Sequence, residues 1–210
     1  SARAMGHYGG PYDDLMPNLD RFAGQSVMID NYYNHTAATY RGIQGSLSSG
    51  FPFAGGAGGW EGSQDRLTEL SSVSYATLPK ILDARGYDTR MYSPHTQSKP
   101  FDDFLRAVGF EQVLTLEDVV PDSPTNLLSD RDLFAEMAAD LQARDQSRMQ
   151  TPFFWASYNI GSHAFLDTPV GAETYRDGRN SALNRFHELD ASLIKLLDAF
   201  EASTFVDNTL

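Results

Sequence analysis

One hydroxyl stands where a helix is expected to begin. Residues 34–42 form a polar turn that contains Thr39 and Arg41, and they precede a short helix predicted to run to about Ser49. The first turn of a helix collects unpaired N–H groups and the positive end of the helix dipole, so Thr39 could lie beside a bound phosphate. The same threonine could be a plain N-cap. The local sequence alone favours the cap, because nearly every helix needs one.

The composition of the chain and two missing sequence patterns exclude several classes of function. The 210 residues carry 28 acidic and 16 basic side chains, for a net charge of -12, which argues against nucleic acid as a partner. The absence of Cys excludes disulfides, zinc-thiolate sites and Cys nucleophiles. The serines of residues 45–50 lack a glycine two positions away on each side, so a serine-hydrolase elbow is set aside. No apolar run reaches the length of about 18 residues that a transmembrane segment needs.

The elements that must position these side chains alternate between helices and short strands. Apolar spacing and caps predict helices that begin after Pro17 and over residues 77–86, 102–108, 129–144 and 180–202. Strand patterns cover residues 26–33, 87–92, 111–114 and 152–159, and the last is apolar on both faces, as expected of a central strand. The order predicts one α/β domain over residues 1–210, with a mostly parallel sheet flanked by helices on both faces.

Four stretches, taken together and in this order, resemble the sulfatase-like branch of the alkaline phosphatase superfamily, which includes lipoteichoic acid synthases and phosphoglycerol transferases. The four stretches are residues 1–9 with Pro17-Asn18-Leu19-Asp20, the segment around Thr39 with Gly50-Phe51-Pro52, Gly161-Ser162-His163, and Asp190 with Asp207-Asn208-Thr209. The resemblance spans essentially the whole chain. The implied fold is a truncated alkaline-phosphatase-like core.

The resemblance assigns roles to individual residues. Thr39 falls on the family's nucleophile, which also binds the metal, with Thr36 as the fallback if the alignment slips by one turn. A threonine hydroxyl is a weak nucleophile unless a divalent cation lowers its pKa. His163 falls on a substrate-side histidine suited to binding phosphate oxygens or assisting the leaving group, and Arg41 is a second substrate-binding candidate. His95 is interpreted as a loop histidine.

Two departures from the family narrow the chemistry. Where lipoteichoic acid synthases carry an arginine that grips phosphate, this chain reads Pro100-Phe101-Asp102-Asp103, which disfavours phosphoglycerol as the transferred group. Formylglycine sulfatases need Cys or Ser followed by x-Pro-x-Arg, and no such run occurs.

The family's other metal ligands are expected outside these 210 residues: a Glu just before Ser1 and an Asp-His pair soon after Leu210. The resemblance therefore predicts an internal fragment that is itself inactive, with Thr39 as the one metal ligand present and no metal bound. Missing strands would leave exposed sheet edges, so we expect self-association. In the full-length protein the resemblance implies a divalent ion, with Mn, Zn, Mg and Ca all represented in the superfamily.

The predicted function is a metal-dependent phosphoryl or phosphoglycerol-type transferase, or a phosphate or sulfate ester hydrolase, of the cell envelope. Its substrate would be a phosphate or sulfate ester, with lipid-linked and glycan-linked esters among the candidates. Relatives place the parent protein in the periplasm or on the extracytoplasmic face of the membrane, held by a membrane anchor. The alternative is a non-catalytic envelope binding domain that keeps the fold without the metal site.

Overall fold

The computed structural model describes residues 5–32, 39–48, 67–68, 76–96, 99–163 and 166–209. Its contacts divide the chain into two compact units, which are described separately. The sheet unit comprises residues 31–126 and 150–157, and the helical unit comprises residues 1–30, 127–149 and 158–210. The fold prediction is confirmed at the level of an α/β chain with a parallel sheet and flanking helices.

Three parallel strands form the sheet unit, in the order β2-β1-β3. They are β1 (Asp88–Tyr92), β2 (Gln112–Leu114) and β3 (Phe153–Ser157). Tyr92 pairs with Leu114 on one side and with Ser157 on the other. The prediction of a central strand at residues 152–159 is therefore wrong for the described sheet, in which β1 holds the centre. Apolarity on both faces signals burial, whereas strand order depends on contacts far apart in sequence.

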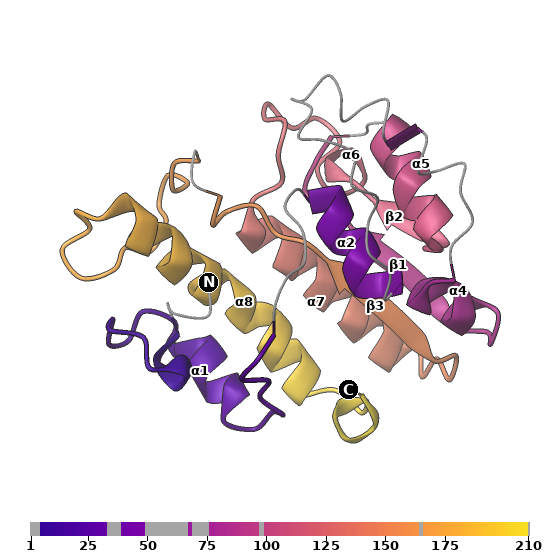
Figure 1. Cartoon of the computed structure of the whole chain (residues 1–210), viewed down its shortest axis with the longest axis horizontal. Coiled ribbons are helices and arrows are strands. Elements are labelled where there is room, and N and C mark those ends of the chain that lie inside the picture. The colour runs from indigo at the N-terminus through magenta and orange to yellow at the C-terminus, as the bar shows by residue number, and fades with distance from the viewer. Residues whose placement is uncertain are drawn as a thin grey trace. The chain divides into compact units, whose positions relative to one another are not determined.

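Helices α2 (Thr39–Ser48), α4 (Leu78–Asp83), α5 (Lys99–Val108) and α6 (Leu116–Val119) complete the sheet unit (Figure 1). The Thr77 side chain accepts a hydrogen bond from the Lys80 N–H, which confirms the predicted cap of α4. Gly109, at φ +116°, follows α5, and a Cβ there would lie 2.7 Å from the Lys80 nitrogen. Only glycine fits this close approach without strain.

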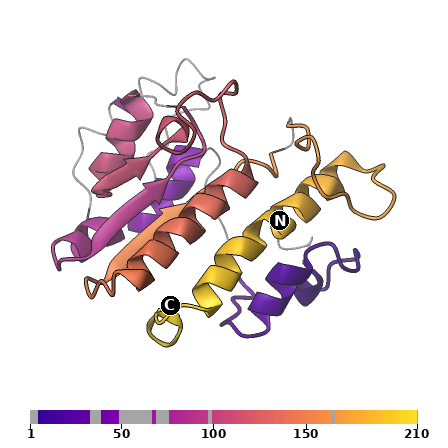
Figure 2. The same cartoon turned by 180° about the vertical axis from the view of Figure 1, so that it is seen from behind.

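The helical unit contains α1 (Pro17–Ala23), α7 (Asp130–Gln146) and α8 (Ser181–Glu201), with short 3-10 turns η2 (Gly6–Tyr8) and η3 (Val206–Asn208). Both views show α8 lying between α7 and α1 (Figures 1 and 2). Ser129 caps α7 and Asn180 caps α8, each through a side-chain oxygen that accepts backbone N–H groups. The predicted helix starts are confirmed because caps act within a few residues.

A small apolar cluster joins the helices of this unit. Leu15, Met16 and Tyr175 are buried, and partly buried apolar side chains pack against them, from α1 and α8 among other segments: Met5, Leu19, Leu183, Phe186 and Leu189. Each fully buried apolar side chain of this kind stabilises the folded state by about 1.5–3 kcal/mol. Leu183, Phe186 and Leu189 thus mark the side of α8 that packs against this cluster.

One predicted strand is absent. Residues 26–32 adopt no strand conformation in the structure, and Val27 and Ile29 are exposed at 95% and 59%. Residue 33 and the predicted turn through residue 38, including Thr36, lie outside the described residues. β-forming side chains become a strand only when a neighbouring strand completes the hydrogen-bond ladder, so propensity alone misled the prediction here.

Candidate functional site

Thr39 is the first residue of α2 and its side chain is exposed. The neighbouring Tyr40 packs edge-on against Phe104 of α5, with ring centroids 6.4 Å apart. Arg41 is half-buried, and its guanidinium lies 5.6 Å from the centre of the Tyr40 ring. The hydroxyl therefore stands at the N-terminal end of a ten-residue helix, where N–H groups lack partners within the helix. The aromatic contact fixes this end of α2 within the sheet unit.

His163 ends a turn that a buried carboxylate holds. Asp130, the first residue of α7, is only 4% exposed. Its oxygens accept hydrogen bonds from the Asn159 side-chain amide at 3.0 Å, the Ile160 N–H at 3.2 Å and the Gly161 N–H at 2.9 Å. His163 then donates its N–H to the Ile160 carbonyl at 2.8 Å and exposes its side chain. The turn after β3 is therefore fixed by a residue about 30 positions earlier.

A second contact follows His163. Its carbonyl accepts the Leu166 N–H at 3.2 Å, and the Leu166 carbonyl accepts a hydrogen bond from Arg185 Nη1 of α8 at 3.1 Å. The Arg185 Nε is buried and has no hydrogen-bond partner among the described residues. The backbone on both sides of His163 is thus tied to helices of the helical unit.

The predicted site residues fall in different units. Thr39 and Arg41 both lie in α2 of the sheet unit, two residues apart, whereas His163 belongs to the helical unit. His95, also in the sheet unit, lies after β1 with its ring 6.2 Å from the Phe101 ring. Burial lowers the pKa of His95, which favours the neutral imidazole. His95 forms a single β-bridge beyond the end of β1, and its carbonyl accepts the Leu116 N–H at 3.0 Å, so it lies outside any helix or longer strand.

Two of the stretches that carry the family resemblance contact each other: Asp190 and the segment that contains Asn18 and Leu19. The Asp190 carboxylate of α8 is 1% exposed and accepts the Asn18 N–H at 3.0 Å, the Leu19 N–H at 2.8 Å and the Asn18 side-chain amide at 2.9 Å. Burial raises the pKa of Asp190, although the hydrogen bonds from Asn18 and Leu19 oppose that shift. Asp20 in turn accepts the N–H groups of Gly6 and His7. These motif residues secure α1 and the segment before it.

Sequence reasoning missed Asp130. It predicted the helix start at Ser129-Asp130 but gave the aspartate no role beyond the helix end. The available signal was Gly161: a Cβ there would come within 2.5 Å of an Asp130 carboxylate oxygen. A glycine beside a candidate site histidine indicates a close approach by another group, although it does not say which group.

The described residues contain no cluster of three or more His, Cys, Asp or Glu side chains that could hold a metal ion. Thr39 alone does not fit a stable metal site, which needs three or four protein ligands. No helix in the described part of the chain has both the length and the apolarity needed to cross a membrane.

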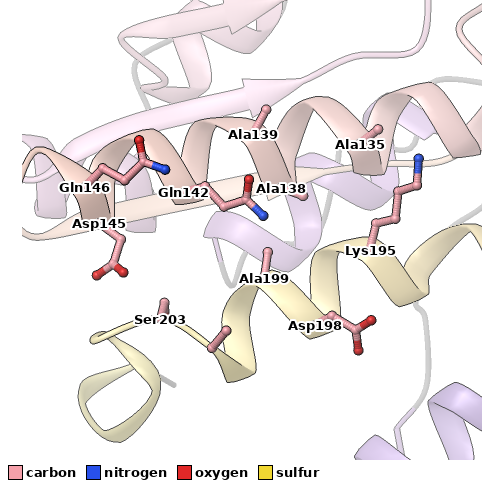
Figure 3. A pocket seen from close by; sticks show the side chains of 11 residues that line it. Ala135, Ala138, Ala139, Gln142, Asp145, Gln146, Lys195, Asp198, Ala199 and Ser203 are labelled. Atoms are coloured by element: carbon pink, nitrogen blue, oxygen red, sulfur yellow. The ribbon is translucent and has the colours of Figure 1, made fainter.

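A cavity of about 520 Å³ lies between α7 and α8, away from every predicted site residue of the same unit. Ala135, Ala138 and Ala199 face it, and Gln142, Lys195 and Asp198 stand around it (Figure 3). Its lining combines small apolar side chains with polar groups that include Lys195 and Ser203, and it contains no histidine and none of the predicted site residues. This cavity is not the site that the motifs indicate.

One family model matches this chain, and two solved structures share its fold. The family model described as Sulfatase matches residues 1–210. A protein in the alkaline phosphatase superfamily from Vibrio parahaemolyticus superimposes with a TM-score of 0.79 at 21% identity, covering 100% of this chain and 50% of that chain. The lipoteichoic acid synthase LtaP from Listeria monocytogenes gives 0.75 at 16% identity, covering 92% and 47%.

The two solved structures show the fold, and this chain spans about half the length of each. A search of curated proteins found no match.

Proposed function

Because this chain belongs to the sulfatase family, we propose that the protein carrying it is a phosphoryl transferase or ester hydrolase with the Thr39 hydroxyl as its nucleophile. The match over the whole chain carries the proposal. The position of Thr39 as the first residue of α2 supports it, because charge that develops on a phosphoryl group is stabilised at a helix N-terminus.

The reaction proceeds in two displacements. The Thr39 oxygen attacks phosphorus while the bond to the leaving oxygen breaks, which forms a phosphothreonine and releases an alcohol. Water or an acceptor alcohol then attacks the same phosphorus and restores the threonine. A divalent ion held by Thr39 together with further ligands would lower the pKa of the hydroxyl. His163 binds a phosphate oxygen or protonates the leaving oxygen, and Arg41 adds positive charge.

The substrate is a phosphate or sulfate ester, and the phosphate ester is the better candidate. LtaP is a lipoteichoic acid synthase, so lipid-linked phosphodiesters are natural test substrates. Residues 100–103 lie in the first half of α5, and Lys99 there pairs with Asp103 at 2.7 Å. The segment that would carry a phosphate-gripping arginine therefore presents carboxylates instead. This favours a head group other than phosphoglycerol.

We place the parent protein at the extracytoplasmic face of the membrane, in the periplasm or the outer envelope, on the same family grounds. A non-catalytic envelope binding domain is the competing proposal. The two differ in whether any ester is turned over, so one set of assays separates them.

The test compares three variants of the full-length protein on a nitrophenyl phosphate, a nitrophenyl phosphodiester and a nitrophenyl sulfate, with each of Mn, Zn, Mg and Ca. We expect Thr39→Ala to lower turnover of a phosphate ester by about 10³-fold or more and Thr39→Ser to retain measurable turnover. Thr36→Ala is the control and should resemble the wild type. If Thr36→Ala alone loses turnover, the nucleophile is Thr36 and not Thr39. If the wild type turns over none of the esters, the result favours the non-catalytic binding domain.

A further inference from the structure

The turn that carries His163 is built around a carboxylate that the proposed chemistry does not use. Asp130 accepts three hydrogen bonds from Asn159, Ile160 and Gly161, the residues that lead into His163. We infer that Asp130 is a positioning residue for His163: it fixes the backbone of the turn and acts on the reaction only through that histidine. This inference rests on the proposed role of His163.

The three donors need acceptor oxygens at position 130. Two of them are backbone N–H groups and one is a side-chain amide N–H, so all three require an acceptor. A carboxylate offers two acceptor oxygens, whereas an asparagine at position 130 would place its own N–H₂ group against one of the donors. Asp130 also sits at the first residue of α7, where the helix dipole favours negative charge. The site is therefore suited to aspartate and poorly suited to its neutral isostere.

The fit is also steric. At Gly161 a Cβ would stand 2.5 Å from one Asp130 oxygen and 2.8 Å from the carboxyl carbon, both closer than real contacts allow. Because the carboxylate is 4% exposed and bonded on both oxygens, it cannot swing away freely. The glycine and the aspartate form one matched contact, in which each is required by the other.

The hydrogen bonds to Asp130 restrain the backbone position of His163. The His163 N–H binds the Ile160 carbonyl, and Ile160 is itself held by Asp130, so two hydrogen bonds connect the carboxylate to the histidine backbone. Arg185 restrains the segment after His163 through the Leu166 carbonyl. A catalytic side chain on an exposed turn would otherwise sample many positions. A misplacement of 1 Å can lower a rate by about 10²-fold.

The experiment compares Asp130→Asn with Asp132→Asn in the full-length protein. Asp132 shares the first turn of α7 and the same dipole and is exposed. Within the described part of the chain its carboxylate accepts a hydrogen bond only from Ser129 Oγ. We expect Asp130→Asn to lower kcat for a phosphate ester by about 10- to 100-fold with little change in KM, and Asp132→Asn to leave both near the wild-type values. In a His163→Ala background, Asp130→Asn should have no further effect on kcat, because it acts through the missing imidazole.

Amide hydrogen exchange supplies a readout that does not depend on turnover. We expect faster exchange at Ile160 and Gly161 in Asp130→Ala, which removes the one oxygen that accepts both of their N–H groups, and unchanged exchange in the control Asp132→Ala. Unchanged exchange would overturn the inference. The inference would also be overturned if His163→Ala lowers kcat but Asp130→Asn does not. Additive losses of kcat in the double variant would overturn it as well.

Failure of the proposed function gives a different pattern. If exchange quickens while His163→Ala leaves kcat at the wild-type value, His163 has no catalytic role and Asp130 only shapes a turn, which overturns the positioning claim together with that role. If Asp130→Asn does not fold, Gly161→Ala tests the same contact with the carboxylate intact. It should show the same fall in kcat and the same faster exchange at Ile160, and unchanged values of both would contradict the inference.

Discussion

Two buried aspartates of the helical unit perform the same task on different segments. Asp130, at the start of α7, accepts the N–H groups of the turn before His163, and Asp190, in the middle of α8, accepts those at the start of α1. They are 4% and 1% exposed. In each case a carboxylate replaces the partners that backbone donors would find in water.

The segments that they hold differ in what else supports them. α1 rests on the apolar cluster that includes Leu15 and Met16, so the bonds to Asp190 reinforce a packed interface. The turn before His163 ends in an exposed side chain and is held by polar contacts. Removing Asp190 should therefore lower global stability, whereas removing Asp130 should loosen one turn. Asp190 therefore stabilises the fold of the helical unit, whereas Asp130 orders a turn of the candidate site.

The largest effect on stability is expected at Asp190. Asp190→Ala leaves the Asn18 and Leu19 N–H groups without their acceptor in a buried place, and we expect a loss of about 3 kcal/mol in the free energy of unfolding. Denaturant unfolding monitored by circular dichroism measures it. Asp198→Ala on the same helix is the control, since its side chain is 66% exposed and its contact with Arg21 is 3.9 Å long.

A loss for Asp190→Ala no greater than that for the Asp198 control would contradict the comparison, because the carboxylate would then contribute nothing beyond an exposed charge. The prediction would also be contradicted if Asp190→Ala only quickens amide exchange in residues 17–23 and leaves the global unfolding midpoint unchanged. In that case α1 would be a local element like the turn.

The next largest effect concerns pH. Burial raises the pKa of Asp190 above its ordinary value of 3.8. Between that value and the higher folded-state pKa, the folded chain binds more protons than the unfolded chain, so this group's contribution to stability falls as the pH rises through the window. In Asp190→Asn that fall disappears. Unfolding curves of the wild type and the variant across the acidic range test it, and identical pH slopes would refute the assignment.

How much could be predicted from the sequence follows from the range of each interaction. Caps act over about three residues, so the starts of α4, α7 and α8 at Thr77, Ser129 and Asn180 were predicted correctly. The failed strand at residues 26–32 and the misplaced centre of the sheet both depended on partners elsewhere in the chain. β-propensity describes a side chain's fit to a sheet and does not say whether a neighbouring strand is present.

The candidate site divides in the same way. Thr39 could be proposed because a hydroxyl near a helix start has a local meaning. The predicted boundary was late, since residues 39–42 of the predicted turn already belong to α2, which begins at Thr39. The link from Asp130 to Gly161 spans 31 residues, and although the glycine indicates a close approach, nothing near it identifies Asp130 as the partner. The motif residues Asn18 and Asp190 could be recognised, but their partnership across 172 positions came only from the structure.

The smallest expected effect on stability is that of removing the N-cap of α7, and it tests whether the cap or Asp130 orders the turn before His163. Ser129 Oγ accepts the Asp132 N–H at 3.1 Å, so Ser129→Ala removes the cap and should lower the free energy of unfolding by about 1 kcal/mol. Ser129→Asn, which keeps a capping oxygen, is the matched control and should stay within about 0.5 kcal/mol of the wild type. Exchange at Gly161 should remain slow in both variants, because Asp130 keeps its own three bonds. Fast exchange in Ser129→Ala alone would mean that the cap, rather than the carboxylate contact, orders the turn before His163.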